Sequence, residues 1–257
     1  MTMQEIDFLD PTLAPSIVLV RPQMGENIGA AARAMLNFGL DKMRVVNARD
    51  GWPNEKAIAM ASGAGRVLDA ALHVEGLDGA LRDVTYSYAT TARARDLTKT
   101  VFTPEGAAAD ALRRMAMGQK VSFVFGPERS GLENEDLAQC NALITVPVNP
   151  DYGSLNLAQC VLLVAYEFRR QATAHPAITQ SATDTDAAGS AEMQALATHY
   201  EERLSEAGFF WPEAKAQSMR IHLRNLWSRL ELTRADVQML HGIMRQMVRW
   251  KERGSDR

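Results

Sequence analysis

The chain has 257 residues, a formal net charge of −3 and two cysteines. A chain of this length buries roughly 70–75% of its unfolded surface, so we expect it to fold without disulfides or a structural metal. The mild acidity argues against a general nucleic-acid binder, a class that is usually basic, although a local basic surface is compatible with it.

Cys140 and Cys160 form no CxxC pair, and the five histidines lack the spacing of metal ligands. We therefore predict buried thiols in a reducing compartment and no metal site. The first residues show no basic region followed by an apolar run, and no apolar stretch reaches the roughly 18 residues that span a membrane. These patterns predict a cytoplasmic protein without a secretory signal or a membrane span.

The first part of the chain alternates between strand and helix patterns. Apolar runs at 16–20 and 43–46 and an alternating aromatic segment at 84–89 predict strands. Residues 27–39 predict a helix because apolar side chains recur every fourth position before a glycine. Residues 55–71 are predicted to be mostly helical, despite Gly63 and Gly65.

The pattern continues to residue 170. Ser130 and Glu133 have the spacing of a capping box, which predicts a helix start at Ser130. The other elements of this part are strands at 121–125 and 143–146 and helices at 103–117 and 154–170. Strands that alternate with helices predict an α/β domain with a mainly parallel sheet.

The composition changes after residue 170. Segment 171–190 is rich in Ala, Thr, Ser and Asp and lacks periodicity, so we predict a flexible linker after a domain at 1–170. Residues 191–257 show helical periodicity without a strand pattern, which predicts a small all-helical domain. Its apolar stripes are Tyr200, Leu204 and Ala207; Leu223, Leu226, Trp227 and Leu230; and Val237, Leu240, Met244, Met247 and Val248.

The clearest basic stretch lies in this helical domain. Lys215, Arg220, Arg224 and Arg229 occur with no acid between residues 214 and 230. Arg220 and Arg224 are four residues apart, so on a helix they share a face. Such a face either contacts phosphates or is simply solvated, and composition does not decide between the two.

Gly25 and Gly29 lie at the start of the first predicted helix. A phosphate site at the helix N-terminus and a tight strand-to-helix turn both explain them, and the pattern is neither a dinucleotide fingerprint nor a P-loop. Arg33 lies among small residues of the same helix, where its guanidinium needs an anionic or polar partner. A salt bridge with Glu26 is the alternative to a functional role.

Two further turns carry polar residues. The turn at 126–131 follows a predicted strand, at the end where open α/β sheets bind ligands, and Gly126 would let a ligand approach the backbone. The turn at 149–156 contains Ser154 and Asn156, which could be a helix cap and a first-turn residue. Taken singly, each turn is compatible with an ordinary loop.

In combination, these segments resemble the three signature motifs of the SPOUT class of RNA 2'-O-ribose methyltransferases. The matching segments are Asn27-x-Gly-x-x-x-Arg33, Phe125-Gly-x-Glu-x-x-Gly-Leu132, and Val146-Pro147 followed by Ser154-Leu-Asn-Leu157. The resemblance covers about residues 16–170. It implies a SPOUT fold with a parallel sheet and a C-terminal trefoil knot, an obligate homodimer, and S-adenosylmethionine bound in the knot.

The chain is most similar to the bacterial tRNA (cytidine/uridine) 2'-O-methyltransferases that act at position 32 of the anticodon loop. Residues 90–95, residues 149–152 and the helical extension carry this closer resemblance. Pro127 and Gly153 depart from it, because relatives can carry a basic residue and commonly carry a serine at these places. The residues that it implies around the cofactor are Thr90, Thr91, Ala92, Gly126, Val146, Gly153, Ser154 and Leu155.

The resemblance also implies the catalytic residues. Arg33 of one subunit would act in the site of the other, and Asn27, Ser154 and Asn156 would hold Arg33 and the ribose hydroxyl by hydrogen bonds. Because arginine keeps its proton at physiological pH, we expect Arg33 to position the ribose and a phosphate while another acceptor takes the hydroxyl proton. The residues expected to contact tRNA are Arg93, Arg95, Arg220 and Arg224.

Alternative functions stay open at this point. The target could be another RNA, such as ribosomal RNA, or the chain could be a non-catalytic knotted RNA-binding protein. The joint presence of Arg33, Ser154 and Asn156 argues against lost catalysis. The missing phosphate-binding fingerprints argue against a third alternative, a nucleotide-binding regulatory module.

Overall fold

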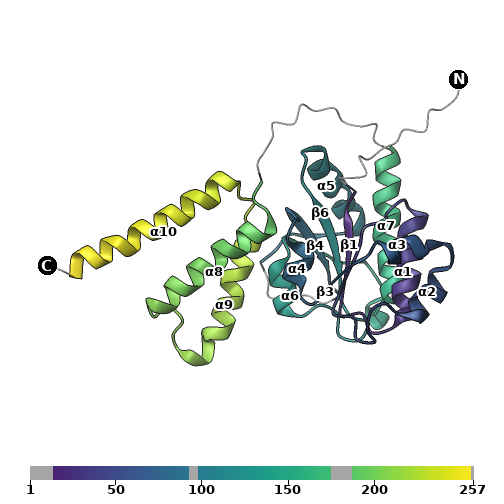
Figure 1. Cartoon of the computed structure of the whole chain (residues 1–257), viewed down its shortest axis with the longest axis horizontal. Helices are drawn as coiled ribbons and strands as arrows, with labels where there is room; N and C mark the ends of the chain where they lie inside the picture. Colours follow the sequence, from purple (N-terminus) through teal and green to yellow (C-terminus); the bar gives the residue numbers. More distant parts are fainter. Residues whose placement is uncertain (1–13, 93–97, 175–186, 256–257) are drawn as a thin grey trace, which may run out of the picture.

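The described residues up to 174 form one part of the molecule, which we call the body and which is built on a parallel sheet (Figure 1). The computed structural model describes residues 14–92, 98–174 and 187–255. Seven strands pair in parallel in the order β3-β2-β1-β6-β4-β7-β5. Their bounds are Ser16–Val20 (β1), Met43–Val46 (β2), Leu72–Val74 (β3), Tyr86–Thr90 (β4), Val101–Phe102 (β5), Val121–Phe125 (β6) and Ala142–Ile144 (β7).

Helices cover both faces of this sheet. Ile17 and Leu19 of β1 belong to one apolar core, and Val18 and Val20 belong to the core on the opposite face. Because side chains alternate along a strand, a strand covered on both faces is apolar at every position, which explains the continuous apolar runs in the sequence. The first core is covered by α1 (Gly25–Asn37), α2 (Glu55–Ala61), α3 (Gly65–Asp69), α5 (Pro104–Ala116) and α7 (Leu157–Ala174), and the second by α4 (Leu77–Leu81) and α6 (Asn134–Gln139).

The strands predicted at 16–20, 43–46 and 121–125 are confirmed residue for residue. Sequence analysis missed β3, β5 and α4. These elements have three, two and five residues, too few to show a period, and β3 and β5 lie at the two edges of the sheet.

The segment predicted to be mostly helical at 55–71 is confirmed as α2 and α3, with a 3-10 turn at Ser62–Ala64 between them, in which Ser62 has a φ of 51°. Glycines on either side of Ala64 weaken a continuous helix there. One predicted helix feature, the capping box at Ser130, is wrong. The capping box is formed by Glu133 with Asp136, and not by Ser130 with Glu133, because carboxylates can make the same two bonds to backbone N–H groups.

The helix predicted at 154–170 begins and ends later, as α7. Asn156 caps it, since its Oδ1 accepts from the backbone N–H groups of Ala158 (2.9 Å) and Gln159 (3.3 Å). At the other end Gln171 donates to the carbonyl oxygen of Glu105 (2.6 Å), so the helix continues to Ala174. The predicted linker 171–190 therefore overlaps α7 and the start of the next helix, while its middle, 175–186, lies outside the described residues. The trefoil knot stays a prediction from the resemblance.

Three helices follow, as predicted: α8 (Ser190–Glu206), α9 (Glu213–Ser228) and α10 (Arg234–Ser255). We call them the helical unit. Their core contains Leu196, Trp227 and Val237. The predicted stripes are only partly buried, because Leu226 is 37% exposed and Met247 is 61% exposed.

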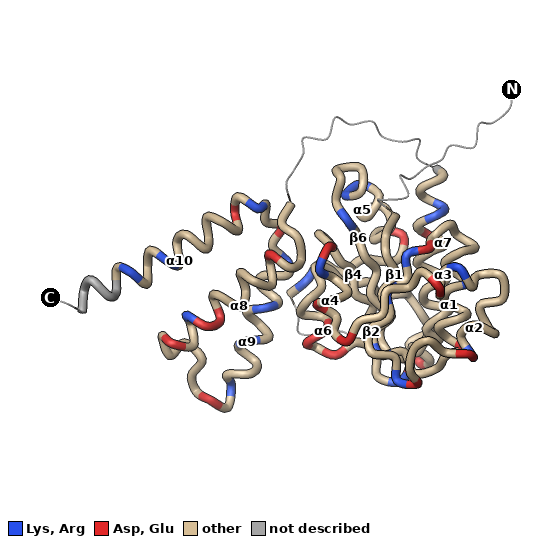
Figure 2. Tube along the Cα trace, in the orientation of Figure 1, with Lys and Arg blue, Asp and Glu red and all other residues tan. Residues whose placement is uncertain are grey.

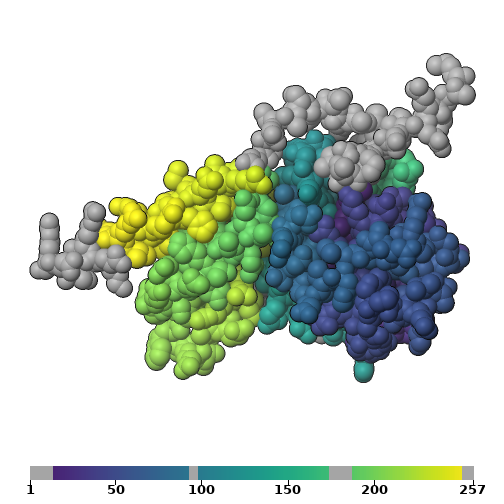
Figure 3. Space-filling view, in the orientation of Figure 1, coloured from purple at the N-terminus to yellow at the C-terminus, as the bar shows by residue number. Residues whose placement is uncertain are grey.

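The helical unit packs against the body along α4 and α6 (Figure 3). Arg114 of α5 is 5% exposed and forms an ion pair with Glu231 at 2.7 Å, just after α9. The Ser190 amide donates to the carbonyl oxygen of Val84 (2.7 Å). Polar contacts of this kind, one of them made by a buried arginine, hold the helical unit at a defined place on the body.

Candidate functional site

A cavity of about 380 Å³ lies at the carboxyl ends of β4, β6 and β7. This is the end of a parallel sheet where ligands bind, since loops rather than side chains of the next helix form its rim. The structure brings all of the predicted cofactor residues to this cavity, although they come from three separate segments. They are Thr90, Thr91, Ala92, Gly126, Val146, Gly153, Ser154 and Leu155.

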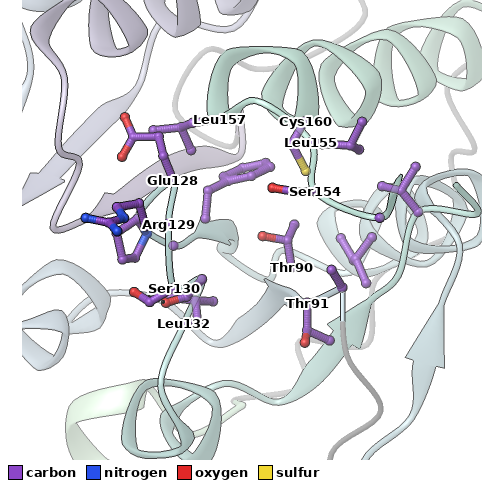
Figure 4. A pocket seen from close by; sticks show the side chains of 18 of the residues that line it. Thr90, Thr91, Glu128, Arg129, Ser130, Leu132, Ser154, Leu155, Leu157 and Cys160 are labelled. Atoms are coloured by element: carbon purple, nitrogen blue, oxygen red, sulfur yellow. Dashed lines mark hydrogen bonds between the residues drawn. The ribbon is translucent and has the colours of Figure 1, made fainter. Parts of the chain in front are cut away.

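The centre of the cavity carries neutral polar groups. The Thr90 hydroxyl donates to the carbonyl oxygen of Val124 (3.2 Å). Burial raises the pKa of the Cys160 thiol to about 11, so this side chain stays neutral. Figure 4 shows Glu128 and Arg129 at one side of the cavity with their charged ends directed away from Thr90 and Ser154. The site thus offers hydroxyls and backbone groups between apolar walls.

The two glycines of the cavity have different roles. A Cβ on Gly126 would collide with the backbone of Gly131 and Leu132. The expectation that Gly126 makes room for a ligand is thus incomplete, because its own loop already occupies that space. A Cβ on Gly153 would meet only Val148, at 3.8 Å, so a serine would fit there.

A hydrogen-bonded link ties together the three motifs beside the cavity. Asn27 donates through its Nδ2 to Glu128 Oε1 (2.7 Å) and accepts through its Oδ1 from Asn156 Nδ2 (2.9 Å). The Glu128 carboxylate also accepts from the backbone amides of Gln23 (2.8 Å) and Met24 (3.3 Å). It thereby fixes the backbone just before α1, whose N-cap Met24 makes no side-chain capping bond of its own.

Sequence analysis gave Glu128 no role, although it quoted the motif that contains it. The available signal was that Glu128 is the only acid of the turn at 126–131. Asn27 and Asn156 bind each other and do not line the cavity itself, whereas Ser154 does. The prediction that these three residues hold Arg33 and the ribose hydroxyl stays a prediction.

Arg33 lies apart from this link. It is exposed on α1 and is absent from the residues that line the cavity of its own chain. The simple alternative, an ion pair with Glu26, is wrong, because Glu26 pairs with Lys56 at 3.3 Å. Within its own chain Arg33 therefore has neither the ion pair with Glu26 nor a place at the cavity.

The arginines predicted to contact RNA on α9 share a face, as expected, but they also share a carboxylate. Arg220 Nε and Arg224 Nη2 lie 3.2 and 3.1 Å from the two oxygens of Glu201 on α8. Arg220 also lies over the ring of Phe210, 4.3 Å from its centroid. Figure 2 shows both signs of charge along α8 and α9. Arg93 and Arg95 lie outside the described residues.

Neither a membrane span nor a metal cluster is found in the described part of the chain. No helix there is long and apolar enough to cross a membrane. The same residues contain no group of three or more His, Cys, Asp or Glu side chains able to hold a metal ion.

Comparison with known proteins decides the family. A family model described as the SpoU rRNA Methylase family matches residues 14–166, which is more than half of the chain. The chain belongs to the SpoU methylase family. A second model, the C-terminal domain of the tRNA methyltransferase TrmJ, matches residues 191–256 of this SpoU methylase. The predicted family, the predicted α/β fold followed by helices, and the prediction of a methyltransferase are confirmed.

Similar proteins share both parts of this SpoU methylase. The tRNA (cytidine/uridine/adenosine-2'-O-)-methyltransferase TrmJ of Pseudomonas aeruginosa (strain UCBPP-PA14) is 34% identical over 236 residues, which is 89% of this chain and 91% of that protein. The tRNA (cytidine/uridine-2'-O-)-methyltransferase TrmJ of Photorhabdus laumondii is 34% identical over 238 residues, which is 92% of this chain and 98% of that protein. The crystal structure of TrmJ from Z. mobilis ZM4 matches with a TM-score of 0.82 and 43% identity, over 91% of this chain and 99% of that one.

Proposed function

We propose that this protein transfers a methyl group from S-adenosylmethionine to a ribose 2'-hydroxyl of tRNA, at position 32 of the anticodon loop, in the cytoplasm. The observation that carries the proposal is the convergence of three separate segments, each implied by the resemblance to contact the cofactor, on one cavity. The TrmJ proteins that are similar over both parts of the chain are tRNA 2'-O-methyltransferases by name.

The residues of the cavity fit S-adenosylmethionine. A volume of about 380 Å³ lies within the range of small-molecule sites. Leu132, Ile144 and Leu155 provide apolar walls for a base, and the hydroxyls of Thr90 and Ser154 provide polar contacts. When bound, the sulfonium of this cofactor supplies an activated methyl group. The protein then has to orient two reactants and keep its own charges away from the sulfonium.

The asparagines and Ser154 would position the acceptor ribose. The link from Asn156 through Asn27 to Glu128 fixes the loops on both sides of the cavity. The Ser154 hydroxyl, which lines the cavity, would hydrogen-bond the ribose or the guanidinium that holds it. Arg33 would bind the ribose oxygen and an adjacent phosphate, so that negative charge on the attacking oxygen is stabilised as its proton leaves.

Arg33 has to come from a second copy of the chain for this arrangement. It is exposed and does not line its own cavity. The helix α7, which packs beside α1, exposes Leu162 (39%), Leu163 (37%) and Tyr166 (46%). An exposed apolar group of this kind marks an interaction surface. We therefore include a homodimer through α1 and α7 in the proposal.

Ribosomal RNA is the second candidate substrate, because the family model is described by rRNA methylation. The helical unit favours tRNA, since residues 191–256 match the C-terminal domain of a tRNA methyltransferase.

The test is methylation of defined RNAs. The protein is incubated with S-adenosylmethionine labelled on its methyl group and with unmodified tRNA transcripts, and the modified nucleoside is then mapped. We expect one 2'-O-methylated ribose, at position 32, which a transcript with a 2'-deoxy residue at that position would lack. Label in ribosomal RNA alone, or at a base, would contradict the proposal.

A further inference from the structure

Lys99 joins three elements at the seam between the body and the helical unit. Its ammonium donates to the backbone carbonyl oxygens of Ala138 (3.3 Å) and Cys140 and also contacts the hydroxyl of Ser228. Burial lowers the pKa of Lys99 to about 8, and the nearby Arg229 cation adds to this effect. At neutral pH the group is therefore still mainly charged, and its three N–H donors match three oxygens.

One side of this contact leads to the cavity through α6. Ala138 lies in the last turn of α6 and Cys140 is its C-cap, so the ammonium satisfies carbonyl groups that the helix leaves open. At its other end α6 begins at Asn134, and only its N-cap Glu133 separates it from Leu132, the last residue of the loop that lines the cavity. A shift of α6 therefore moves this loop.

The other side of the contact is the end of α9. Ser228 is the last residue of α9, and its carbonyl oxygen accepts from Asn141 Nδ2 (2.7 Å). The Oδ1 of Asn141 in turn accepts from the amide of Ser87 in β4 (2.8 Å). Arg229 donates to the carbonyl oxygen of Thr98, next to Lys99 (3.2 Å).

These contacts end on the strands that carry the cavity. Asn141 immediately precedes β7, whose last residue Ile144 lines the cavity and accepts from the amide of Thr91 (2.9 Å). The end of α9 is thus connected to the cavity by two routes. One runs through Lys99 and α6, and the other runs through Asn141 and the pair β4 and β7.

We propose that Lys99 is a positioning residue through which the seating of α9 on the body sets the affinity of the cavity for S-adenosylmethionine. The inference rests on the proposed function, because it takes this cofactor as the ligand. With Ser228 in place, α6 is held at its C-terminal end and the loop up to Leu132 keeps its shape. A helical unit that is displaced, for example by RNA bound to it, would release this end of α6 and change cofactor affinity without touching the cofactor.

The experiment compares two small changes on opposite sides of the contact in the full-length protein. K99M removes the ammonium and keeps a side chain of similar length, and S228A removes only the hydroxyl on α9. The matched controls are K120M, which changes a 55% exposed lysine, and S218A, which changes an exposed serine on α9 itself. S-adenosylmethionine binding is measured by calorimetry without RNA, and KM and kcat are measured with tRNA.

We expect K99M to weaken cofactor binding about tenfold, because it removes all three hydrogen bonds of the ammonium, and S228A about threefold, because it removes only one of them. The KM for the cofactor should rise in parallel while kcat at saturation stays within about twofold, because no reacting group is altered. In the double variant K99M/S228A the two effects should be less than additive, since both act through one contact. The controls should bind like the parent.

Equal cofactor affinity in K99M, S228A and the parent would overturn the inference and leave the proposed function intact. Additive effects would also overturn it, because the two residues would then act independently. A fall in kcat at unchanged KM would contradict a role in cofactor binding. If the parent itself did not bind S-adenosylmethionine, the proposed function would fail instead. Because S228A only shortens a side chain at a helix end, it keeps the test valid even if K99M folds poorly.

Discussion

The cavity of the body and the basic face of the helical unit use polar side chains in opposite ways. Beside the cavity, Asn27, Glu128 and Asn156 come from three distant segments and bind one another. On the helical unit, Arg220 and Arg224 come from one helix, and both bind Glu201 of the neighbouring helix. The first arrangement builds a site out of residues that the motifs single out. In the second arrangement, Glu201 neutralises part of the positive charge of the two arginines in the basic stretch of the sequence.

This difference shows which features of a sequence are informative about function. Loops at the carboxyl ends of parallel strands meet by topology, so short motifs in them are expected to converge. A stretch of arginines on a helix has no such guarantee, because an acid from another helix can neutralise it. One carboxylate between two guanidinium groups leaves one positive charge of two, which weakens any attraction to phosphate.

The largest expected effect comes from Arg33, on the body side of this comparison. R33A should lower methyl transfer about 10²–10³-fold, as the removal of a group that stabilises developing charge does. Cofactor affinity should be largely unchanged, because the proposed contacts of Arg33 are with the ribose and a phosphate of the RNA and not with the cofactor. Single-turnover methylation and calorimetry measure the two quantities. R66A, which changes another exposed arginine of the body, is the matched control.

The shared site can be tested with the same variant. A mixed dimer of an R33A chain and a chain with a defective cofactor cavity should recover activity in one of its two sites. Absence of recovery, with dimers present, would show that Arg33 does not act across subunits.

The next effect, on the helical unit, tests whether its arginines still reach RNA. R220E/R224E should weaken tRNA binding and lower its salt slope by roughly 0.7–0.9 for each phosphate that the protein no longer neutralises. E201Q should act in the opposite direction, because it frees both guanidinium groups. Binding is measured across a salt series. If R220E/R224E and E201Q both bind like the parent, the α9 face is solvated and takes no part in RNA binding.

A smaller effect is expected from the link beside the cavity. E128Q keeps the shape of the side chain but lowers the strength of its bonds to Asn27 and to two backbone amides, which should destabilise the fold by about 1–2 kcal/mol. The exposed acid Glu135 provides the control, E135Q. Denaturant unfolding measures the change. An unaltered midpoint for E128Q would mean that the carboxylate does not stabilise the start of α1.

The smallest effect should follow from G153S. The added Cβ meets only Val148, at 3.8 Å, so cofactor affinity should stay within about twofold, which is the size of a minor change in packing. G126A, by contrast, would force a side chain into the backbone of its own loop. Calorimetry on both variants compares the two glycines directly. A large fall in affinity in G153S would mean that the cofactor approaches this backbone more closely than its surroundings indicate.

Much of the fold could be predicted from the sequence because its central strands are buried on both faces. Ser16–Val20 and Val121–Phe125 are apolar at nearly every position, and a glycine, a proline or a polar turn follows each. The edge strands Leu72–Val74 and Val101–Phe102 could not be predicted. They are partly exposed and short, and neighbouring backbone rather than their own side chains defines them.

The sequence predicted those residues of the candidate site that lie in the motifs. It did not predict residues whose role depends on hydrogen bonds to distant parts of the chain. Every cavity residue named from the resemblance lies at the cavity. Glu128 was missed because its three donors, the side chain of Asn27 and the amides of Gln23 and Met24, lie about a hundred residues earlier. Lys99 was missed for the same reason, since Ser228 is 129 residues away. Contacts at such separations leave no local pattern.

The position of β1 in the middle of the sheet has a consequence for the synthesis of the chain. Ser16 pairs with Ser122, 106 residues later, so one side of β1 stays open until β6 has been made. At ribosomal rates this interval is about 5–20 s. During it an apolar strand with unpaired backbone groups is exposed to other nascent chains, and such an edge is a template for aggregation. Among the strands of the sheet, β1 therefore waits for the longest stretch of synthesis before its second neighbouring strand exists. A chaperone that covers residues 16–20 during this interval would protect the segment that is most exposed to aggregation.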